Sequence, residues 1–291
     1  MNKIDFVYIF GVVNSNPNGD PAANNEPRTN PITGKGIVRN GCISRKIKNY
    51  IEASQDEKGM DIYYKKDSIL EETNNEILKE SDKKQKDSKQ NKKKFCDEEK
   101  KLFMDRFFDI RSTGGVITKS GKSGGDIYGP VQFSMAESID PVYIVTMTIT
   151  RSCSAKKSEE GEGKDDGKET GKMGSQSVVC FGYYKMNGNI CPQRANKTGM
   201  TNSDVDLLFN ALENMWEIDK SSNRPSIYPK AIVVFEHNSK LGNVKSHELY
   251  RCVKVIKNKG VEEPSCDDDY KIEINDPQIN GITMKVLYLD A

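Results

Sequence analysis

The sequence predicts an α+β fold of the ferredoxin-like type, built on a β-α-β-β-α-β order of elements. Three observations support this prediction. An apolar run near the N-terminus, IDFVYIFGVV, has the composition of a buried strand, and strand-like runs recur along the chain. Two amphipathic segments, 41–53 and 201–216, have helical periodicity. Two polar stretches, 54–101 and 152–177, interrupt this order and are predicted to be insertions.

Composition limits the classes of function that are open to this chain. Of its 291 residues, 30% are charged and 35% are hydrophobic, and the formal net charge is only +1. Nucleic-acid binding must therefore come from local basic clusters. Seven cysteines without a CxxC pair and only two histidines argue against a zinc site and a secreted disulfide framework. We expect reduced thiols, a cytoplasmic location and no membrane span, since no run approaches the roughly 20 apolar residues required.

The N-terminal part is predicted to form a strand, a loop and a helix. Residues 3–13 carry apolar side chains at both even and odd positions, as in Phe6 and Val7, which is typical of a central strand. Residues 14–36 are rich in Asn, Pro and Gly, which is the composition of a loop. The segment 41–53 has apolar residues on one helical face and basic residues on another.

The first insertion, 54–101, is rich in Lys, Glu, Asp and Asn and has few apolar residues, so we expect it to be helical only in patches. Its Lys run at 83–94 is most simply a solvated surface, and contact with a nucleic-acid backbone is the alternative. From residue 102 the chain again has core-like composition. The Gly/Ser/Lys loop that follows lacks the spacing and the strand-to-helix context of a phosphate loop.

The second insertion, 152–177, lies between two strand-like runs, DPVYIVTMTITR and VVCFGYY. This arrangement predicts two neighbouring strands with a long polar connection between them. Met173 is the one large apolar residue inside the connection. The connection could be solvated chain, or it could become ordered on binding a ligand.

The C-terminal part is predicted to hold one helix and several strands. Thr201 and Asp204 form a capping-box pattern before the helix 201–216. His237 ends the strong strand AIVVFEH, and we expect it to be a hydrogen-bonded structural residue rather than a catalytic one. The alternating runs at 270–274 and 282–289 are expected to pair with each other.

No catalytic constellation is present in the sequence: it contains no nucleophile elbow, no HExxH and no Walker motif. Asp20, with Glu26, could hold a divalent ion in the Asn-rich loop. Asp20 precedes Pro21, however, at a position where Asp commonly closes a turn. The sequence therefore indicates a binding protein rather than an enzyme, with no metal and no cofactor.

The segment from Asn14 to Tyr50 is the strongest candidate for a binding site. Basic side chains at a helix start, after a loop rich in amides, suit phosphate oxygens and sugar hydroxyls. The ferredoxin-like topology is also that of the RNA-recognition fold. We interpret the segment as one wall of a groove for single-stranded RNA, and a protein-interaction module is the alternative. The candidate RNA-binding residues here are Asn14, Asn16, Asn18, Arg28, Arg39, Ser44, Arg45, Lys46 and Lys48.

Several motifs, in the same order along the chain, resemble the backbone subunit of the CRISPR type I Cascade surveillance complex, in its I-B/I-C branch. Arg45 and Lys48 match the family's helix motif, whereas Arg39 is chosen on charge alone. The resemblance covers most of the chain except 54–101. The stretches that carry it are NPNGDPAANNEPRTNPITGKGIV, CISRKIKNY, DIRSTGGVI, YGPVQFSMAESIDPVYIVTMTITR, GKMGSQSVVCFGYYKMNGNI, DVDLLFNALENMWEIDKSSNRP and VFEHNSKLGNVKSHELY.

The resemblance implies a hand-shaped molecule. Its ferredoxin-like palm would be formed by 1–53 and 178–291, with a palm or web segment at 102–151. The insertion 54–101 would be the fingers and 152–177 the thumb. Lys172 and Met173, in the motif GKMGS, would contact the RNA at the thumb, with Met173 as an apolar wedge.

The resemblance also implies a function. Copies of the subunit would polymerise along a CRISPR guide RNA beside other Cascade subunits and present the guide to target DNA in antiviral defence. Each thumb would flip one base out of the guide. The subunit itself would not be a nuclease. The alternative within the same superfamily is a type III backbone subunit that cleaves RNA in a metal-dependent reaction, for which Asp20 would be the candidate.

Overall fold

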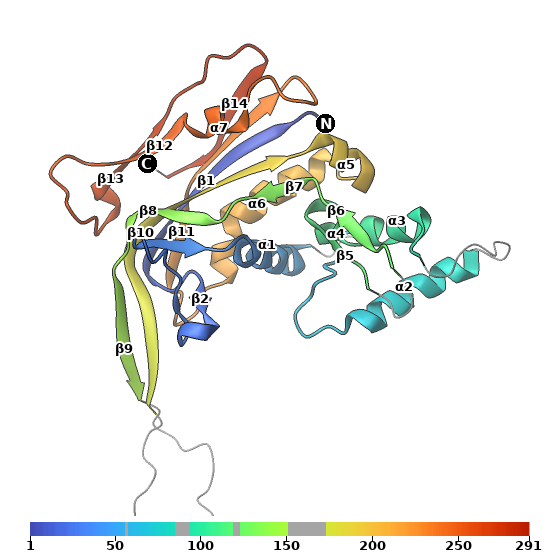
Figure 1. Cartoon of the computed structure of the whole chain (residues 1–291), viewed down its shortest axis with the longest axis horizontal. Coiled ribbons are helices and arrows are strands. Elements are labelled where there is room, and N and C mark those ends of the chain that lie inside the picture. The colour runs from blue at the N-terminus through green and yellow to red at the C-terminus, as the bar shows by residue number, and fades with distance from the viewer. Residues whose placement is uncertain (56–57, 85–93, 119–122, 151–172, 291) are drawn as a thin grey trace, which may run out of the picture.

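An eight-stranded antiparallel sheet organises the molecule (Figure 1), with strands in the order β14-β11-β1-β10-β8-β4 and with β7 and β9 also paired to β10. The computed structural model describes residues 1–55, 58–84, 94–118, 123–150 and 173–290. The strands are β1 Ile4–Ser15, β2 Gly19–Asp20, β3 Glu26–Pro27, β4 Lys35–Val38, β5 Gly114–Val116, β6 Asp126–Tyr128, β7 Val131–Phe133, β8 Ala136–Pro141, β9 Ile144–Thr150, β10 Met173–Ile190, β11 Ser226–His237, β12 Val253–Lys257, β13 Tyr270–Ile274 and β14 Ile282–Leu289. The helices are α1 Asn40–Ser54, α2 Leu70–Lys84, α3 Asp97–Arg106, α4 Phe108–Ser112, α5 Pro192–Thr198, α6 Asn202–Ile218 and α7 Ser246–Tyr250.

The N-terminal strand β1 lies in the middle of the sheet. It pairs with β10 on one side and with β11 on the other, both antiparallel. Its even-numbered residues, such as Phe6 and Tyr8, belong to one hydrophobic cluster, and Val7 and Ile9 belong to a second one on the opposite face. The prediction of a central strand buried on both faces is therefore confirmed.

The two predicted amphipathic helices are confirmed as α1 and α6, and they cover one face of the sheet. Both contribute apolar side chains to the cluster that contains Phe6 and Tyr8. Thr201 and Asp204 form the predicted capping box at the start of α6. Near its end, Trp216 donates from Nε1 to the Tyr8 hydroxyl at 2.9 Å, so the buried indole N–H has a partner.

The opposite face of the sheet is covered by α7 and the hairpin of β12 and β13, which pack on Val7, Ile9 and residues of β10. The expected pairing of 270–274 with 282–289 is wrong, because β13 pairs with β12 and β14 pairs with β11. Strand β14 occupies the edge of β11 that faces away from β1. An alternating pattern specifies a buried face but not a partner strand. His237 accepts Asn243 N–H at Nδ1 (2.8 Å) and bonds Asp5 through Nε2 (2.8 Å), which confirms its structural role.

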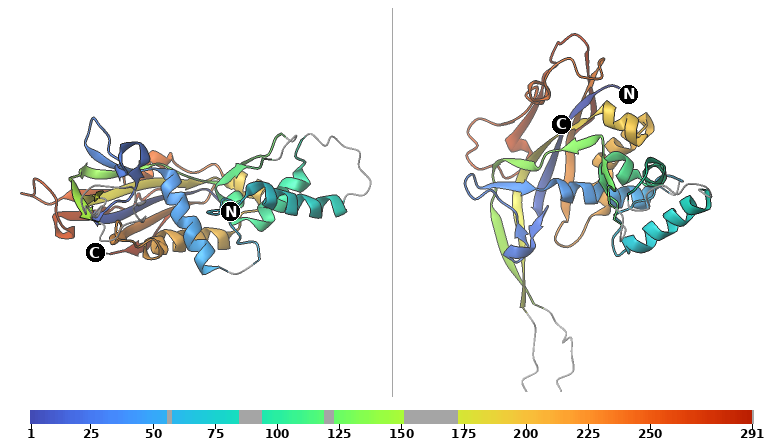
Figure 2. Two further views of the ribbon diagram at one scale, coloured as in Figure 1. Left: turned by 90° about the horizontal axis from the view of Figure 1, so that it is seen from below. Right: turned by 45° about the vertical axis from the view of Figure 1, so that its right-hand side comes forward.

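A helical unit stands beside the sheet (Figures 1 and 2), formed by α2, α3, α4 and the β5–β6 hairpin. Its own core joins Tyr63 and Ile77 from the first insertion to Phe103, Phe107 and further residues after the boundary placed at residue 101. The first insertion has few apolar residues because half of this core is supplied by the segment that follows it.

A two-stranded ribbon of β9 and the first part of β10 extends away from the body of the sheet (Figures 1 and 2). The register pairs Val145 with Val178 and Met147 with Gln176. These are the two strands predicted to flank the second insertion, 152–177. Residues 152–172 of that insertion lie outside the described part of the chain, whereas 173–177 belong to β10. Among the described residues, no helix is both long and apolar enough to cross a bilayer.

Candidate nucleic-acid interface

The loop after β1 is held by its own asparagines. Asn16 is almost fully buried and donates from Nδ2 to Asn25 O at 2.7 Å and to Ser177 O at 3.2 Å. Asn18 accepts Arg39 N–H at Oδ1 (2.9 Å), which joins the loop to the start of α1. Asn14 is exposed and has a left-handed backbone (φ 44°), a conformation that Asn tolerates better than most residues. Of the three predicted asparagines, only Asn14 presents its side chain freely.

Asp20 closes the turn that the sequence favours. Its Oδ1 accepts Ala22 N–H at 3.1 Å, and its Oδ2 receives the Arg28 guanidinium at 3.0 Å. Both carboxylate oxygens therefore have a partner within the loop. The described residues contain no group of three or more His, Cys, Asp or Glu that could hold a metal ion.

Two of the predicted basic residues on α1 are tied into the fold. Lys46 is buried and bonds Asp219, 2.5 Å from Nζ to Oδ1, across the end of α6. The Lys48 ammonium lies 3.1 Å from the buried Asp109 carboxylate on α4 and 4.7 Å from the centre of the Tyr64 ring. These lysines hold α1 against neighbouring elements rather than facing an open groove. The sequence carried no signal for this, because their carboxylate partners come from distant segments.

The remaining basic residues at the start of α1 keep open donors. Arg39 is exposed at the N-cap position, and its side chain makes no cap bond to the helix, whereas Asn40 Oδ1 accepts Gly41 N–H at 2.9 Å. Arg45 uses one guanidinium N–H on Tyr64 O and retains the others. Lys35 precedes the helix and Ser44 follows its start, and both are half-buried. The positive end of the helix dipole and these cations together attract anions at this end of α1.

The ribbon has two chemically different faces. One face carries Thr146, which bonds Ser177 at 2.9 Å, and the neighbouring Ser175, whose hydroxyl receives Asn24 Nδ2 at 2.7 Å. This polar face therefore contacts the loop after β1. The other face carries an apolar stripe along β9, with exposed fractions between 45% and 58% for Tyr143, Val145, Met147 and Ile149. On the same face of β10, Gln176 donates from Nε2 to Ser222 O at 2.9 Å.

Of the two predicted RNA-binding residues of the thumb, Lys172 and Met173, the structure describes only the backbone of Met173. Met173 opens β10 and its backbone pairs with Thr150. Lys172 lies outside the described residues. The structure thus brings the loop and the base of the ribbon together, but it leaves the Lys172 contact and the Met173 side chain without a described position.

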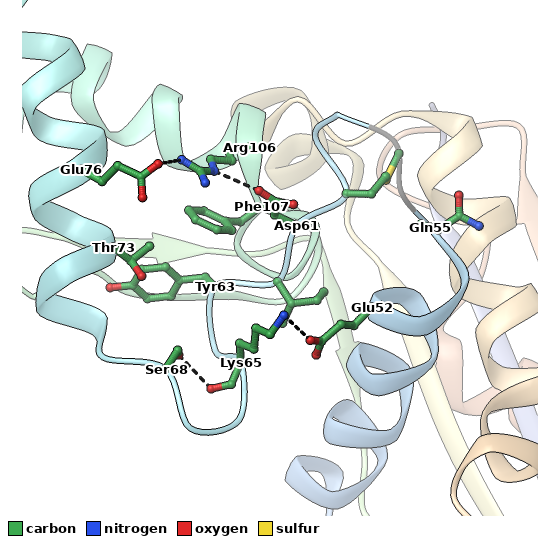
Figure 3. Close-up of a pocket in the computed structure, with 12 residues that line it drawn as sticks. Glu52, Gln55, Asp61, Tyr63, Lys65, Ser68, Thr73, Glu76, Arg106 and Phe107 are labelled. Carbon is green, nitrogen blue, oxygen red and sulfur yellow. Dashed lines mark hydrogen bonds and ion pairs between the residues drawn. The ribbon is translucent and has the colours of Figure 1, made fainter.

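A cleft of about 410 Å³ lies between the end of α1 and the helical unit. Figure 3 shows that the charged side chains lining this cleft form ion pairs with one another. Arg106 lies between Asp61 and Glu76, with both contacts at 2.9 Å. Lys65 bonds Glu52 of α1 at 2.5 Å. Because each charged group there already has a partner, this cleft ties α1 to the helical unit and offers no unpaired charge to a ligand.

Comparisons with known proteins show which family this chain resembles. The family model described as "CRISPR-associated protein Cas7" matches residues 2–275. A curated protein of Haloferax volcanii, "CRISPR-associated protein Cas7", is 23% identical over 254 residues, which are 78% of this chain and 69% of that protein.

Solved structures match the fold. A chain of "CRISPR RNA-guided surveillance complex, pre-nicking" superposes with a TM-score of 0.52 at 12% identity, covering 81% of this chain and 78% of the other. A chain of "CRISPR RNA-guided surveillance complex" gives a TM-score of 0.45 at 14% identity, covering 81% and 70%. The first match extends the likeness from the sequence to the three-dimensional arrangement of the sheet and its helices.

Proposed function

This chain belongs to the CRISPR-associated Cas7 family, and from that premise we propose that it is a non-catalytic backbone subunit that binds guide RNA in a type I surveillance complex. In this proposal copies of the chain assemble along the guide, beside other subunits, and present it to target DNA. A ferredoxin-like palm is supported by the spatial order β11-β1-β10-β8 with α1 and α6 on one face. We assign 1–53, 102–151 and 178–291 to palm and web, 54–101 to fingers and 152–177 to the thumb.

The observation that carries the proposal is the junction of the loop and the ribbon. Asn24 bonds Ser175 and Asn16 bonds Ser177 across more than 150 residues of sequence, which fixes the loop against the ribbon. Asn24 and Ser175 are exposed and form a polar wall at this junction, whereas the Asn16 bond is buried. Beside that wall lies the N-terminus of α1 with Arg39, whose side chain is exposed. A polar wall next to cations suits the phosphates and riboses of RNA and leaves the bases free to pair.

Within this interface we assign different tasks to the predicted residues. Arg39, Arg45 and Asn14 contact RNA, together with Ser44. Asn16, Asn18 and Arg28 keep the loop in shape through their internal bonds. Lys46 and Lys48 orient α1 through Asp219 and Asp109. Lys172 and Met173 contact RNA at the thumb, where an apolar wedge offsets the few kcal/mol that unstacking a base costs.

The test is retention of RNA by a charge-reversed interface. We expect Arg39→Glu with Arg45→Glu to remove the RNA that co-purifies with the chain from cells carrying a CRISPR array, because repulsion replaces phosphate contacts. The measurement is the 260/280 nm absorbance ratio and the length of the extracted RNA.

The matched control is Lys259→Glu with Lys271→Glu, which makes the same charge change at exposed positions of the β12–β13 hairpin. Normal RNA in the Arg39 and Arg45 variant would exclude the helix start as the binding groove. Loss of RNA in both variants would show that only the net charge matters.

The alternative is a type III backbone subunit that cleaves RNA through Asp20. The bonds of Asp20 to Ala22 and Arg28 favour a structural turn over a metal ligand. Incubation of the assembled complex with complementary RNA and Mg²⁺ distinguishes the two functions. Regularly spaced cuts that disappear in Asp20→Ala would establish the cleaving subunit, and intact RNA agrees with the non-catalytic one.

A further inference from the structure

An open groove of about 510 Å³ lies on the sheet face opposite α1 and α6, between β10 and the segment from α7 to β12. Its lining includes the cations of Lys185, Arg251 and Lys254, and no carboxylate contributes to it. Arg251 and Lys254 are exposed, and neither has an ion-pair partner among the described residues. The groove is therefore locally cationic in a chain that is nearly neutral overall.

Lys185 forms the floor of the groove. Its Nζ donates to Tyr250 O at 2.9 Å and to Val253 O at 2.6 Å, which leaves one N–H of the ammonium without a protein acceptor. Burial lowers the pKa of Lys185 because the charged form is partly desolvated. Glu137 lies opposite Lys185 in the β8–β10 register but is exposed and makes no ion pair with it. A half-buried cation held only by carbonyls attracts an anionic group.

Aliphatic side chains of Ile139, Val253, Val255 and Ile256 contribute to the groove, and one of its walls is a strand edge. Four consecutive residues, 253–256, contribute to the lining. A strand that presented one face to the groove would contribute only alternate residues, so β12 presents its edge. Within the described chain β12 pairs only with β13, so its other edge is open. The buried Oδ1 of Asn187, which also lines the groove, has no hydrogen-bond partner among the described residues and can accept an N–H.

We propose that this groove binds an acidic, aliphatic-rich polypeptide segment of a partner protein, which adds as a strand to the open edge of β12. Carboxylates of the segment would face Lys185, Arg251 and Lys254, and aliphatic side chains would pack on Val255 and Ile139. Peptide N–H groups suit the unpartnered amide oxygen of Asn187, and strand addition is a common mode of peptide recognition. His247 and Tyr250 also line the groove, and the Tyr250 hydroxyl is fixed by bonds to Asp5 and to Gly188 O. Because nucleic-acid bases can stack on aromatic rings, binding of a nucleic-acid strand is one of the outcomes that the test distinguishes.

This site is independent of the RNA-binding proposal, since it uses the other face of the sheet. The probe is a fluorescein-labelled peptide of alternating Glu and Val, about six residues long like an ordinary strand, added to the full chain. We expect saturable binding that weakens about tenfold in Arg251→Glu with Lys254→Glu. Lys259→Glu with Lys271→Glu, the same charge change elsewhere on the hairpin, should stay within about twofold of the natural chain. Hydrogen exchange should slow at the β12 amides when the peptide is bound.

Three outcomes would overturn the proposal. One is the absence of saturable peptide binding up to about 1 mM. Another is equal affinity of the peptide for the Arg251 and Lys254 variant. The third is binding of an oligodeoxythymidine strand in place of the peptide. In that case the Arg251 and Lys254 variant loses the oligonucleotide, and the peptide does not displace the oligonucleotide from the natural chain. Thermal unfolding of each variant confirms that the fold persists, so a loss of binding reports on the groove.

Discussion

At the scale of single residues, position on one short helix separates structural cations from free ones. Lys46 and Lys48 are nearly buried and each faces a carboxylate, whereas Arg39 is exposed and Arg45 has one bond to a carbonyl. A cation that loses water must recover the cost from a partner, and breaking such a pair leaves the partner charge uncompensated. The four residues are therefore expected to respond differently to the same substitution.

We predict that Lys48→Glu lowers the free energy of unfolding by about 3 kcal/mol or more, because it places a second carboxylate against the buried Asp109. Arg45→Glu should cost less than about 1.5 kcal/mol, since it removes one bond to Tyr64 O at a half-buried position. Urea denaturation followed by circular dichroism measures both. Equal costs for the two variants would contradict the division into structural and free cations.

At the scale of elements, the β9–β10 ribbon has a polar face and an opposite face with an exposed apolar stripe on β9. Its polar face bonds the loop after β1, while Val145, Met147 and Ile149 remain exposed on the other face. A projecting ribbon with an apolar stripe is a surface that neighbouring chains can cover. The stripe therefore supports the proposed assembly of copies along the guide.

We predict that Met147→Thr with Ile149→Thr weakens RNA-dependent assembly of the chain while its melting temperature stays unchanged. Threonine keeps the strand preference but removes apolar surface from the contact. Sedimentation of the chain with co-purified RNA measures the size of the assembly, and Thr148→Ser, on the polar face, is the control. Assemblies of unchanged size in the double variant would remove the stripe from the interface.

At the scale of the whole molecule, α4 connects the helical unit to the sheet. Asp109 accepts the N–H groups of Tyr63 and Tyr64, at 2.9 and 3.1 Å, while it also faces Lys48. Arg111 forms a two-pronged pair with Asp204 at the start of α6, at 2.7 and 3.1 Å. The two units therefore share a buried ionic connection, which makes their relative position sensitive to protonation.

We predict that this connection contributes to acid unfolding. Burial alone raises the pKa of Asp204, but its bonds from Arg111 and from Thr201 outweigh burial and lower the pKa below the ordinary 3.8. A lowered folded-state pKa stabilises the fold above that ordinary value, and the contribution is lost as pH falls through the folded pKa.

Asp204→Asn should therefore be less stable at pH 7, by about 3 kcal/mol, and should lose less stability than the natural chain between pH 4 and lower values. Urea denaturation at a series of pH values measures this difference. Parallel stability profiles for the two chains would show that Asp204 does not carry the acid sensitivity. Arg111→Lys is the companion variant, because lysine keeps the charge but cannot form the two-pronged pair.

The sequence by itself determined the elements whose signal is local. The two-faced apolar pattern of β1, the stripe and capping box of α6 and the flanks of the β9–β10 ribbon are all periodic within a few residues, and the structure agrees with each. The binding segment after β1 could also be proposed from its composition and from a resemblance of ordered motifs.

Only the tertiary structure decided which groups meet. It placed Asp219, 173 positions from Lys46, against that lysine, and it paired β13 with β12 rather than with β14. It also built the helical unit from residues on both sides of position 101, and it opened the cationic groove beside Lys185. Periodicity specifies which face of an element is buried, whereas the partner that covers this face depends on chain reversals far away in sequence.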